Sequence, residues 1–420
     1  MKIAILLPVN GISGGLYVAY QHGHYLVNRG HEVTIAFLNN ALGTQVTHFR
    51  DFSLPTCLVQ DLVDRDSHFD AIISGWWECF YAMFRIEADH YLHFIQGDDR
   101  ESVRQQYGTR FPSDLPFIER AFSDSRVGYI VVAQWLKTML EKSAELHIEC
   151  APNGIDTSLF NPIVRPLVPR GKKIRVLIEG GSVPFKRVDM AFRVASRIPD
   201  IEIWHVSGDG ILDPGWKSNR TFQRVRQDEM PAIYASCDIL LKLSVVEGFF
   251  GPPLEMMACG GTAVVSRVRG HEEYVVDGFN ALTVPLDDVE GAYRALCKLI
   301  EDRDLRSRLS QEGIRTAKAL DWSRRCPQFE EAILRLIGRV PPILRADRAL
   351  HLAIAQLRDD NLQKTQRFEQ QLADIRAIFV DWKLFRCWKS IRRRLDKLSQ
   401  FAAKSWQRFK RIGRRQLTIR

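Results

Sequence analysis

Two glutamates, Glu247 and Glu255, stand eight positions apart in the segment VEGFFGPPLEMMACGG, residues 246–261. Pro252 and Pro253 between them suit the first turn of a helix, where a missing N–H costs no hydrogen bond. We therefore expect Glu247 in a loop and Glu255 in the first turn of the helix that follows. Backbone amides at a helix start favour an anion, and carboxylates accept hydrogen bonds from sugar hydroxyls. The amides expected to face such a ligand are those of Phe249, Phe250 and Gly251.

A pair of glycines, Gly14 and Gly15, follows an apolar run at Ile3–Val9 and precedes an expected helix over 16–29. Any tight turn could use two glycines, but glycines after a first strand also let a phosphate approach the backbone closely. The pair does not complete the pattern G-x-G-x-x-G, which argues against a dinucleotide site.

The segment from Glu247 to Gly260 matches the signature E-G-F-x-G-x-P-x-E-x-x-A-x-G, and it therefore resembles the glycosyl transferases group 1. This is a large retaining family (family four) of GT-B glycosyltransferases. The resemblance extends over roughly residues 1–340, because further landmarks occur in order along the chain. These landmarks are Gly14-Gly15, Arg29–Thr34, Ala151–Asp156, Lys186, Ser207–Gly210, Tyr234–Asp238, Gly270–Asn280 and Asp321-Trp322.

The resemblance implies a role for several residues. Glu247 would contact the donor sugar and support charge at its ring, and Glu255 would bind the ribose of the nucleotide. Lys186, helped by Arg187, would neutralise the diphosphate as it leaves, since charge grows there when the glycosidic bond breaks. The catalytic candidates are Glu247, Lys186 and Gln96, and the donor-binding candidates are Gly14, Gly15, Arg187, Phe249, Phe250, Gly251 and Glu255.

Two positions depart from the pattern of the family. Gly181 stands five residues before Lys186, where the family usually has an arginine, and Arg187 is the candidate substitute. Gln96 stands at the end of the strand Tyr91–Gln96, where the family often has a histidine. Gln96 keeps hydrogen bonding but has no titrating group.

Neither a metal nor a cofactor is expected, with the nucleotide sugar acting as co-substrate. Asp64-Arg65-Asp66 and Asp302-Arg303-Asp304 both match the D-x-D pattern of metal-dependent GT-A enzymes, but solvated charged surfaces are the simpler interpretation. No group of histidine, cysteine and carboxylate residues has metal-ligand spacing. The eight cysteines contain no C-x-x-C pair, which is typical of free thiols in a reducing compartment.

Strand-like and helix-like segments alternate through two successive stretches, which predicts an α/β protein with two Rossmann-like domains facing a cleft. The strands expected are 3–9, 31–38, 71–74, 91–96, 128–133, 174–179, 201–207, 239–242 and 263–266, and helices are expected at about 16–29, 187–197 and 253–259. Pro162, Pro166 and Pro169 indicate a linker between the two. The boundaries are 1–160 for an N-terminal acceptor-side domain, 161–173 for the linker, 174–320 for the nucleotide-sugar domain and 321–340 for a closing helix.

We expect the last 80 residues to form an α-helical, basic C-terminal extension. Residues 341–381 carry apolar side chains near heptad spacing, so we expect a helix that can form a weak coiled coil. Residues 382–420 hold 14 basic side chains and 1 acidic side chain. Trp382, Trp388 and Trp406 lie among them, and a basic amphipathic helix with tryptophans favours an anionic membrane surface. A helix that packs on the body or on a partner protein remains an alternative.

The sequence therefore predicts a metal-independent glycosyltransferase of hexosyl or deoxyhexosyl type. Its partners would be a nucleotide sugar, a glycan or lipid-linked glycan acceptor and, through 382–420, an anionic membrane, but no nucleic acid. We expect it in the cytoplasm, peripheral at the inner face of the membrane, in cell-surface polysaccharide synthesis. The first alternative is a catalytically weakened homologue that binds nucleotide or glycan as a scaffold. The second is another GT-B enzyme such as a sugar-nucleotide epimerase.

Overall fold

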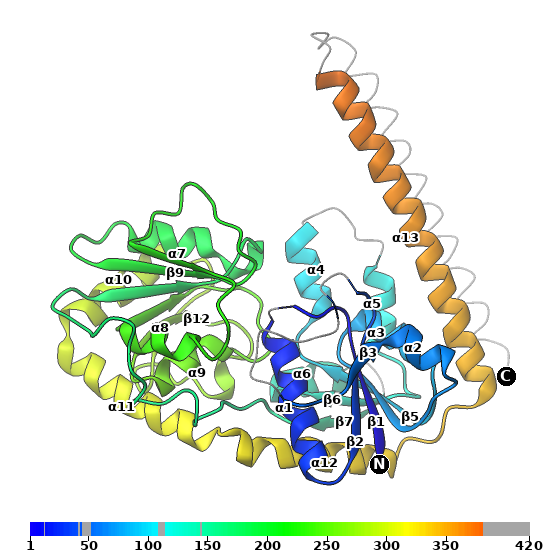
Figure 1. The fold of residues 1–420 in the computed structure, drawn as a ribbon. Helices are drawn as coiled ribbons and strands as arrows, with labels where there is room; N and C mark the ends of the chain where they lie inside the picture. Colours follow the sequence, from blue (N-terminus) through cyan, green and yellow to red (C-terminus); the bar gives the residue numbers. More distant parts are fainter. Residues whose placement is uncertain (12, 41–42, 44–51, 108–113, 143–144, 381–420) are drawn as a thin grey trace. The chain divides into compact units, whose positions relative to one another are not determined.

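The computed structural model describes residues 1–11, 13–40, 43, 52–107, 114–142 and 145–380. The chain divides into two compact units, Met1–Arg358 and Asp359–Arg420. Within the first unit, two parallel β-sheets form two successive halves, shown in blue to cyan and in green to yellow in Figure 1. The expected α/β class, with two Rossmann-like domains, is confirmed.

Among the residues that the structure describes, the first sheet has seven strands in the order β3-β2-β1-β4-β5-β6-β7. Ile3, on an interior strand of this sheet, pairs with Val33 on one side and Ala71 on the other, both in parallel. Consecutive residues of this strand are buried, because helices cover both faces of a parallel sheet. The strands are β1 (Lys2–Leu7), β2 (Glu32–Phe37), β3 (Thr56–Leu58), β4 (His68–Ser74), β5 (Glu87–Ile95), β6 (Gly128–Val131) and β7 (His147–Cys150).

In the described part of the first half, six helices connect these strands. They are α1 (Gly14–Asn28), α2 (Val59–Asp64), α3 (Trp77–Met83), α4 (Asp99–Tyr107), α5 (Leu115–Ala121) and α6 (Gln134–Glu141). Helix α1 starts at Gly14 because Ser13 caps it: the Ser13 side chain accepts a hydrogen bond from the amide of Leu16. Gly14 and Gly15 therefore form the start of the helix and not the turn before it, which corrects the expected start at residue 16.

The second sheet has six parallel strands in the order β10-β9-β8-β11-β12-β13. Its strands are β8 (Arg175–Glu179), β9 (Glu202–Ser207), β10 (Arg220–Gln223), β11 (Ile239–Lys242), β12 (Thr262–Ser266) and β13 (Leu282–Val284). Its helices are the 3-10 turn η1 (Pro184–Lys186), α7 (Val188–Ala195), α8 (Met230–Ser236), α9 (Gly251–Ala258), the 3-10 turn η2 (His271–Glu273), α10 (Val289–Glu301) and α11 (Arg303–Ala319). Every strand expected from the sequence is present, with ends that differ by a few residues. The segment 161–173 contains neither helix nor strand.

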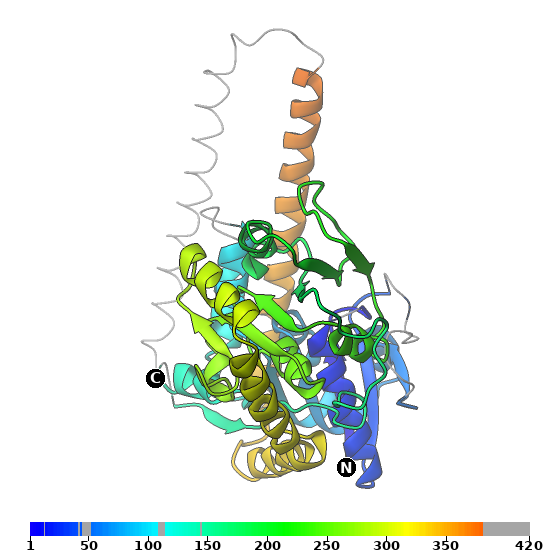
Figure 2. The same ribbon diagram turned by 90° about the vertical axis from the view of Figure 1, so that its left-hand side faces the viewer.

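Helix α12 (Trp322–Ile337) returns from the second half to the first. Figures 1 and 2 show α11 and α12, in yellow, following one another along this path. Trp322 and Phe329 of α12 belong to the core of the first sheet. The ring of His22, from α1, stacks on Phe329 with ring centroids 4.0 Å apart. The closing helix is thus part of the N-terminal core.

A final helix, α13, runs from Arg345 to Val380. Its first turns belong to the first compact unit, because His351 is fully buried and its ring stacks on Phe84 at 3.8 Å. Nε2 of His351 also lies 2.9 Å from the carboxylate of Asp124. The boundary of the expected extension therefore shifts from residue 341 to Arg358.

Two statements about a membrane can be made. None of the helices that the structure describes combines the length and the apolar composition needed to cross a membrane. The basic segment 382–420 lies outside the described residues, so its predicted membrane contact stays a prediction.

Candidate functional site

Charged side chains gather at the carboxyl edge of the second sheet. Strand β8 ends at Glu179 and its neighbour β11 ends at Lys242, and these two strands pair directly. Glu247 lies in the loop after β11, and Lys186 ends the turn η1 that follows β8. The carboxyl edge is where open parallel sheets bind ligands.

Lys186 and Glu247 form a bidentate ion pair. The ammonium of Lys186 donates to both carboxylate oxygens of Glu247 at 2.9 Å. The amide of Val245 donates to the carbonyl of Phe185 at 2.9 Å, and this bond joins the loop of Glu247 to the turn of Lys186. Only 8% of the Glu247 side chain is exposed, compared with 28% of the Lys186 side chain. The lysine is therefore the more accessible of the two to an incoming anion.

Lys242 and Glu179 belong to the same cluster, although the sequence did not identify them. The ammonium of Lys242 donates to the carboxylate of Glu179 and, at 3.0 Å, to its backbone carbonyl. It also lies 4.0 Å from a carboxylate oxygen of Glu247. Burial alone would lower the pKa of Lys242, but the carboxylates of Glu179 and Glu247 raise it above its usual value. The available signal was a single lysine inside the apolar run Ile239–Val246.

Glu255 lies beside this cluster on α9. The hydroxyl of Tyr234 donates to its carboxylate at 2.8 Å. Burial raises the pKa of Glu255 to about 7, while the Tyr234 hydrogen bond opposes the shift. Helix α9 begins at Gly251 and not at residue 253, so Glu255 lies in the second turn and not in the first.

The amides at the start of α9 are fewer than expected. The amide of Gly251 donates to the carbonyl of Phe249 at 2.9 Å, so the prediction of a free Gly251 amide is wrong. Pro252 and Pro253 follow, and proline has no N–H to offer. The side chain of Phe250 is fully buried, which leaves only its backbone for a ligand. The same prolines that predicted the helix start also remove anion donors from it.

The carboxyl edge of the first sheet brings together three predicted residues. Gln96, which follows β5, donates from Nε2 to the carbonyl of Gly15 at 3.1 Å. A Cβ atom on Gly15 would lie 3.2 Å from Oε1 of Gln96, so glycine allows this close contact. Gly14 has open space where its Cβ would be. Gly14, Gly15 and Gln96 thus form an uncharged surface without a titrating side chain of their own.

The two halves meet at Gly248, the residue after Glu247. A Cβ atom on Gly248 would lie only 1.7 Å from the carbonyl oxygen of Gln96, so no other residue fits without a shift of the backbone. The indole N–H of Trp135, at the start of α6, donates to the carbonyl of Gly248 at 2.8 Å. Glu273 accepts a 2.7 Å hydrogen bond from the amide of Gln134. Residues of the first half thus hold the loop that carries Glu247.

Two other sequence predictions concern Arg187 and Gly181. Nε of Arg187 lies 3.1 Å from the carboxylate of Asp287, so its guanidinium has a partner outside the Glu247 cluster. A Cβ atom on Gly181 would lie 2.4 Å from the carboxylate of Asp209. That carboxylate accepts a 2.7 Å hydrogen bond from the amide of Ser182. An arginine at position 181 would therefore displace Asp209.

The D-x-D sequences have local roles in helix ends. Asp302 caps α11 by accepting a hydrogen bond from the amide of Leu305 at 2.8 Å. Asp64, the last residue of α2, accepts from the side chain of Gln60 at 2.6 Å. Within the described ranges, no three histidine, cysteine or carboxylate side chains gather as metal ligands would.

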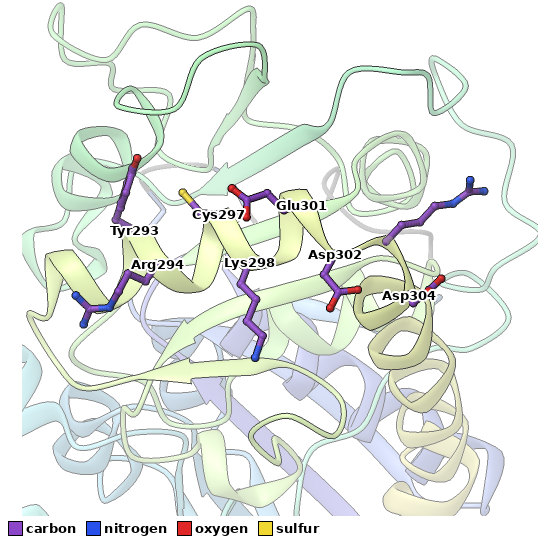
Figure 3. A pocket seen from close by; sticks show the side chains of 8 residues that line it. Tyr293, Arg294, Cys297, Lys298, Glu301, Asp302 and Asp304 are labelled. Carbon is purple, nitrogen blue, oxygen red and sulfur yellow. The ribbon is translucent and has the colours of Figure 1, made fainter.

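A shallow hollow elsewhere lies along α10 (Figure 3). Tyr293, Cys297 and Glu301 line one side of the helix, while Arg294 and Lys298 point to another side. The guanidinium of Arg197 stacks 4.1 Å from the centre of the Tyr293 ring. These charges diverge, so the hollow offers no common point for a ligand.

Comparison with known proteins finds a match to a family model in the second half. Residues 217–316 match the model of the family described as Glycosyl transferases group 1. An α-(1→4)-mannosyltransferase (MMP alpha-(1->4)-mannosyltransferase) from Mycolicibacterium hassiacum is 24% identical over 337 residues, which are 74% of each chain. An uncharacterized glycosyltransferase from Methanocaldococcus jannaschii is 24% identical over 203 residues, 46% of this chain and 56% of the relative. The lipopolysaccharide core biosynthesis glycosyltransferase LpsE from Rhizobium meliloti is 28% identical over 175 residues, 40% of this chain and 50% of LpsE. The chain thus spans about half the length of the last two relatives.

Solved structures agree on the fold. Sucrose-phosphate synthase from Thermosynechococcus elongatus matches with a TM-score of 0.68 at 15% identity, over 80% of this chain and 99% of that one. HepE from Anabaena, in complex with UDP-glucose, matches with a TM-score of 0.64 at 14% identity, over 80% of this chain and 100% of that one. The predicted GT-B architecture and the resemblance to the glycosyl transferases group 1 are confirmed.

Proposed function

We propose that this chain, which carries a glycosyl transferases group 1 match in residues 217–316, transfers a hexosyl or deoxyhexosyl group with retention from a nucleotide sugar to a glycan or lipid-linked glycan. One observation carries the proposal. The accessible ammonium of Lys186 forms an ion pair with the carboxylate of Glu247 at the carboxyl edge of the second sheet. This arrangement places a cation for a diphosphate beside a carboxylate for a sugar.

Each group has a defined task in such a reaction. The bond between the anomeric carbon and the diphosphate breaks, and the acceptor hydroxyl forms a new bond to the same face of that carbon. The departing phosphate takes the proton of the acceptor. Lys186 stabilises the negative charge that develops on the diphosphate, and a preorganised cation away from bulk water is effective in this task. Glu247 supports the positive charge that develops at the sugar ring.

The remaining predicted residues bind and orient the substrates. Glu255 accepts hydrogen bonds from the ribose, for which its carboxylate must be ionised. Gln96 and Gly15 meet at the edge of the first sheet, on the acceptor side, where Gln96 offers hydrogen bonds without exchanging a proton. Retention then requires no carboxylate nucleophile, and the reaction we propose uses no metal.

A screen of nucleotide sugars tests the proposal. The full-length protein is incubated with UDP-, GDP- and ADP-sugars, and release of the free nucleoside diphosphate is measured together with thermal stabilisation. At least one donor should be hydrolysed slowly in the absence of an acceptor. The Glu247→Ala variant should keep its fold and lose this activity, because Glu247 acts at the sugar.

The same screen distinguishes the alternative function. A nucleotide sugar that stabilises the wild-type protein but is never hydrolysed or transferred would contradict the transferase proposal. That outcome would favour a nucleotide-binding scaffold.

The position of the enzyme in the cell is a second part of the proposal. LpsE acts in lipopolysaccharide core biosynthesis, and residues 382–420 carry a net charge of +13. A cluster of basic residues attracts anionic lipid by about 1 kcal/mol per residue. We therefore place the enzyme at the inner membrane face, in cell-surface polysaccharide synthesis.

Sedimentation with anionic liposomes tests this placement. A chain that ends at Val380 keeps the buried first turns of α13 and should stay in solution, whereas the full-length protein should sediment. Equal sedimentation of the two proteins would contradict a membrane role for 382–420.

A further inference from the structure

Lys186 has two tasks that compete. In the proposed function it binds the diphosphate of the donor, but in the structure both oxygens of Glu247 occupy its ammonium at 2.9 Å. An ammonium has three N–H donors and Glu247 takes two of them, so a diphosphate that accepts more than one hydrogen bond from Lys186 must take over part of this pair. Glu247 would then lose its strongest partner at the moment when the sugar arrives.

Water cannot replace that partner easily. The Glu247 side chain is only 8% exposed, and a buried carboxylate without a counter-charge is strongly unfavourable. Other acidic groups nearby make an unpaired Glu247 carboxylate still less favourable. Glu179 and Glu255 both lie in the same cluster, and the diphosphate adds further negative charge. A second cation must therefore remain beside the Glu247 carboxylate.

Lys242 meets this requirement. In the described part of the chain, Lys186 and Lys242 are the two cations that lie within 4.0 Å of the Glu247 carboxylate. The Lys242 side chain is 1% exposed, so neither solvent nor a bound diphosphate displaces it. Its hydrogen bonds to the carboxylate and the carbonyl of Glu179 fix its ammonium at the end of β11. Lys242 is therefore both buried and held in place.

We propose that Lys242 is a positioning residue. It keeps Glu247 in an ion pair when Lys186 binds the diphosphate of the donor. This inference rests on the proposed function and adds a residue to it. In the structure, Lys186 and Lys242 balance Glu179 and Glu247. When the diphosphate binds, Lys186 turns toward it, and Glu247 keeps the ammonium of Lys242.

A double-mutant cycle on nucleoside diphosphate binding tests this exchange of partners. The full-length protein is titrated calorimetrically with UDP, ADP and GDP, and the diphosphate that binds the wild type most tightly is used for the variants. Lys242→Met removes the charge and keeps the length of the side chain. It should weaken binding about tenfold, because bound diphosphate then leaves Glu247 unpaired. Adding Glu247→Gln to Lys242→Met should restore most of the affinity.

Glu179, the hydrogen-bond partner of Lys242, provides the decisive comparison. If Lys242 served only to neutralise Glu179, then adding Glu179→Gln to Lys242→Met would restore affinity at least as well as adding Glu247→Gln does. That result would overturn the proposal, as would unchanged binding by Lys242→Met. Lys298→Met, an equivalent change on the surface of α10, serves as the control and should bind like the wild type.

Two further outcomes are also decisive. If Lys242→Met fails to fold because Glu179 becomes an unpaired buried charge, Glu179→Gln becomes the reference protein, and the cycle is repeated between Lys242→Met and Glu247→Gln in that background. Additive effects there would contradict the proposal. A wild-type protein that binds none of the three diphosphates would instead contradict the proposed function. Diphosphate binding without coupling between Lys242 and Glu247 would contradict only the role of Lys242.

Discussion

The two sheets present edges of opposite character to the proposed substrates. At the edge of the first sheet, Gly14, Gly15 and Gln96 meet without a charge, and glycine lets the glutamine approach the backbone. At the edge of the second sheet, the charged cluster of Glu179, Lys186, Lys242 and Glu247 is joined by Glu255. In the proposed reaction, the second half would perform the electrostatic work, while the first half would mainly shape the space for an acceptor.

The charged edge should therefore be the more sensitive of the two to substitution. A diphosphate needs cations at a fixed place, whereas a sugar acceptor can be bound by many neutral hydrogen bonds. The following predictions test this contrast, and they run from the largest expected effect to the smallest.

Lys186→Ala should lower kcat about 100- to 1,000-fold, the usual loss when a preorganised charge-stabilising group is removed. Donor hydrolysis or transfer by the purified protein measures the change. Lys298→Ala, on the surface of α10, is the matched control and should be as active as the wild type. A Lys186→Ala enzyme within a few-fold of the wild type would remove the main support for the contrast between the edges.

Gly248→Ala tests the point where the two edges meet. Its Cβ atom would lie 1.7 Å from the carbonyl oxygen of Gln96, so the loop of Glu247 must move away from the first half. We expect a loss of about 1–3 kcal/mol in the free energy of unfolding, typical of overpacking, together with a fall in kcat of more than tenfold. Denaturant unfolding and turnover measure the two effects. Gly171→Ala, which has open space around its Cβ, should change neither.

The pH dependence of donor binding tests Glu255. Its pKa is about 7, and the carboxylate form accepts hydrogen bonds from ribose. The ionised fraction rises from about a tenth at pH 6 to about nine tenths at pH 8, so donor affinity should rise by roughly tenfold over this range. Glu255→Gln should bind weakly and without this pH dependence. A wild-type affinity that is flat between pH 6 and pH 8 would contradict the ribose role.

Glu255 should also make the free energy of unfolding depend on pH. Its folded-state pKa lies above its usual value, so the folded protein holds a proton that the unfolded chain has already released. The free energy of unfolding should therefore decrease as pH rises from about 4.5 to above 7. The decrease should be smaller in Glu255→Gln, as measured by denaturant titration across this range.

Gln96→Ala should have the smallest effect of the series. It removes a neutral hydrogen bond to the carbonyl of Gly15, and such a bond contributes about 0.5–1.5 kcal/mol. We expect kcat/KM to fall about threefold to tenfold, with most of the change in the KM of the acceptor. A loss as large as that of Lys186→Ala would show that the uncharged edge also takes part in the chemistry.

Several features of the site were accessible to sequence reasoning because they are local. The two prolines predicted a helix start within two residues of the observed one, and the run Ile239–Lys242 was identified as a strand with its observed ends. Glu247 and Glu255 were placed correctly before and within that helix. Two details were wrong: Glu255 lies in the second turn and not in the first, and the amide of Gly251 is not free because it donates to the carbonyl of Phe249.

Other features could not be predicted because they depend on residues far apart in the chain. Lys242 and Glu179 lie 63 positions apart, and nothing in either local sequence shows that the two strands are neighbours. The contact of Trp135 with Gly248 spans 113 positions. Arg187 looked available for a phosphate until the structure placed its guanidinium beside Asp287.

The sequence alone determined the α/β order of elements, the glycines and prolines that end or begin them, and the spacing of Glu247 and Glu255. These follow from hydrophobic periodicity and backbone chemistry, which act over a few residues. Only the tertiary structure decided which charges share the carboxyl edge, that α12 completes the first core, and that Gly248 meets Gln96. Such pairings depend on strand order and on burial. A buried charge needs a partner of opposite charge, and the fold decides which residue lies close enough to provide it.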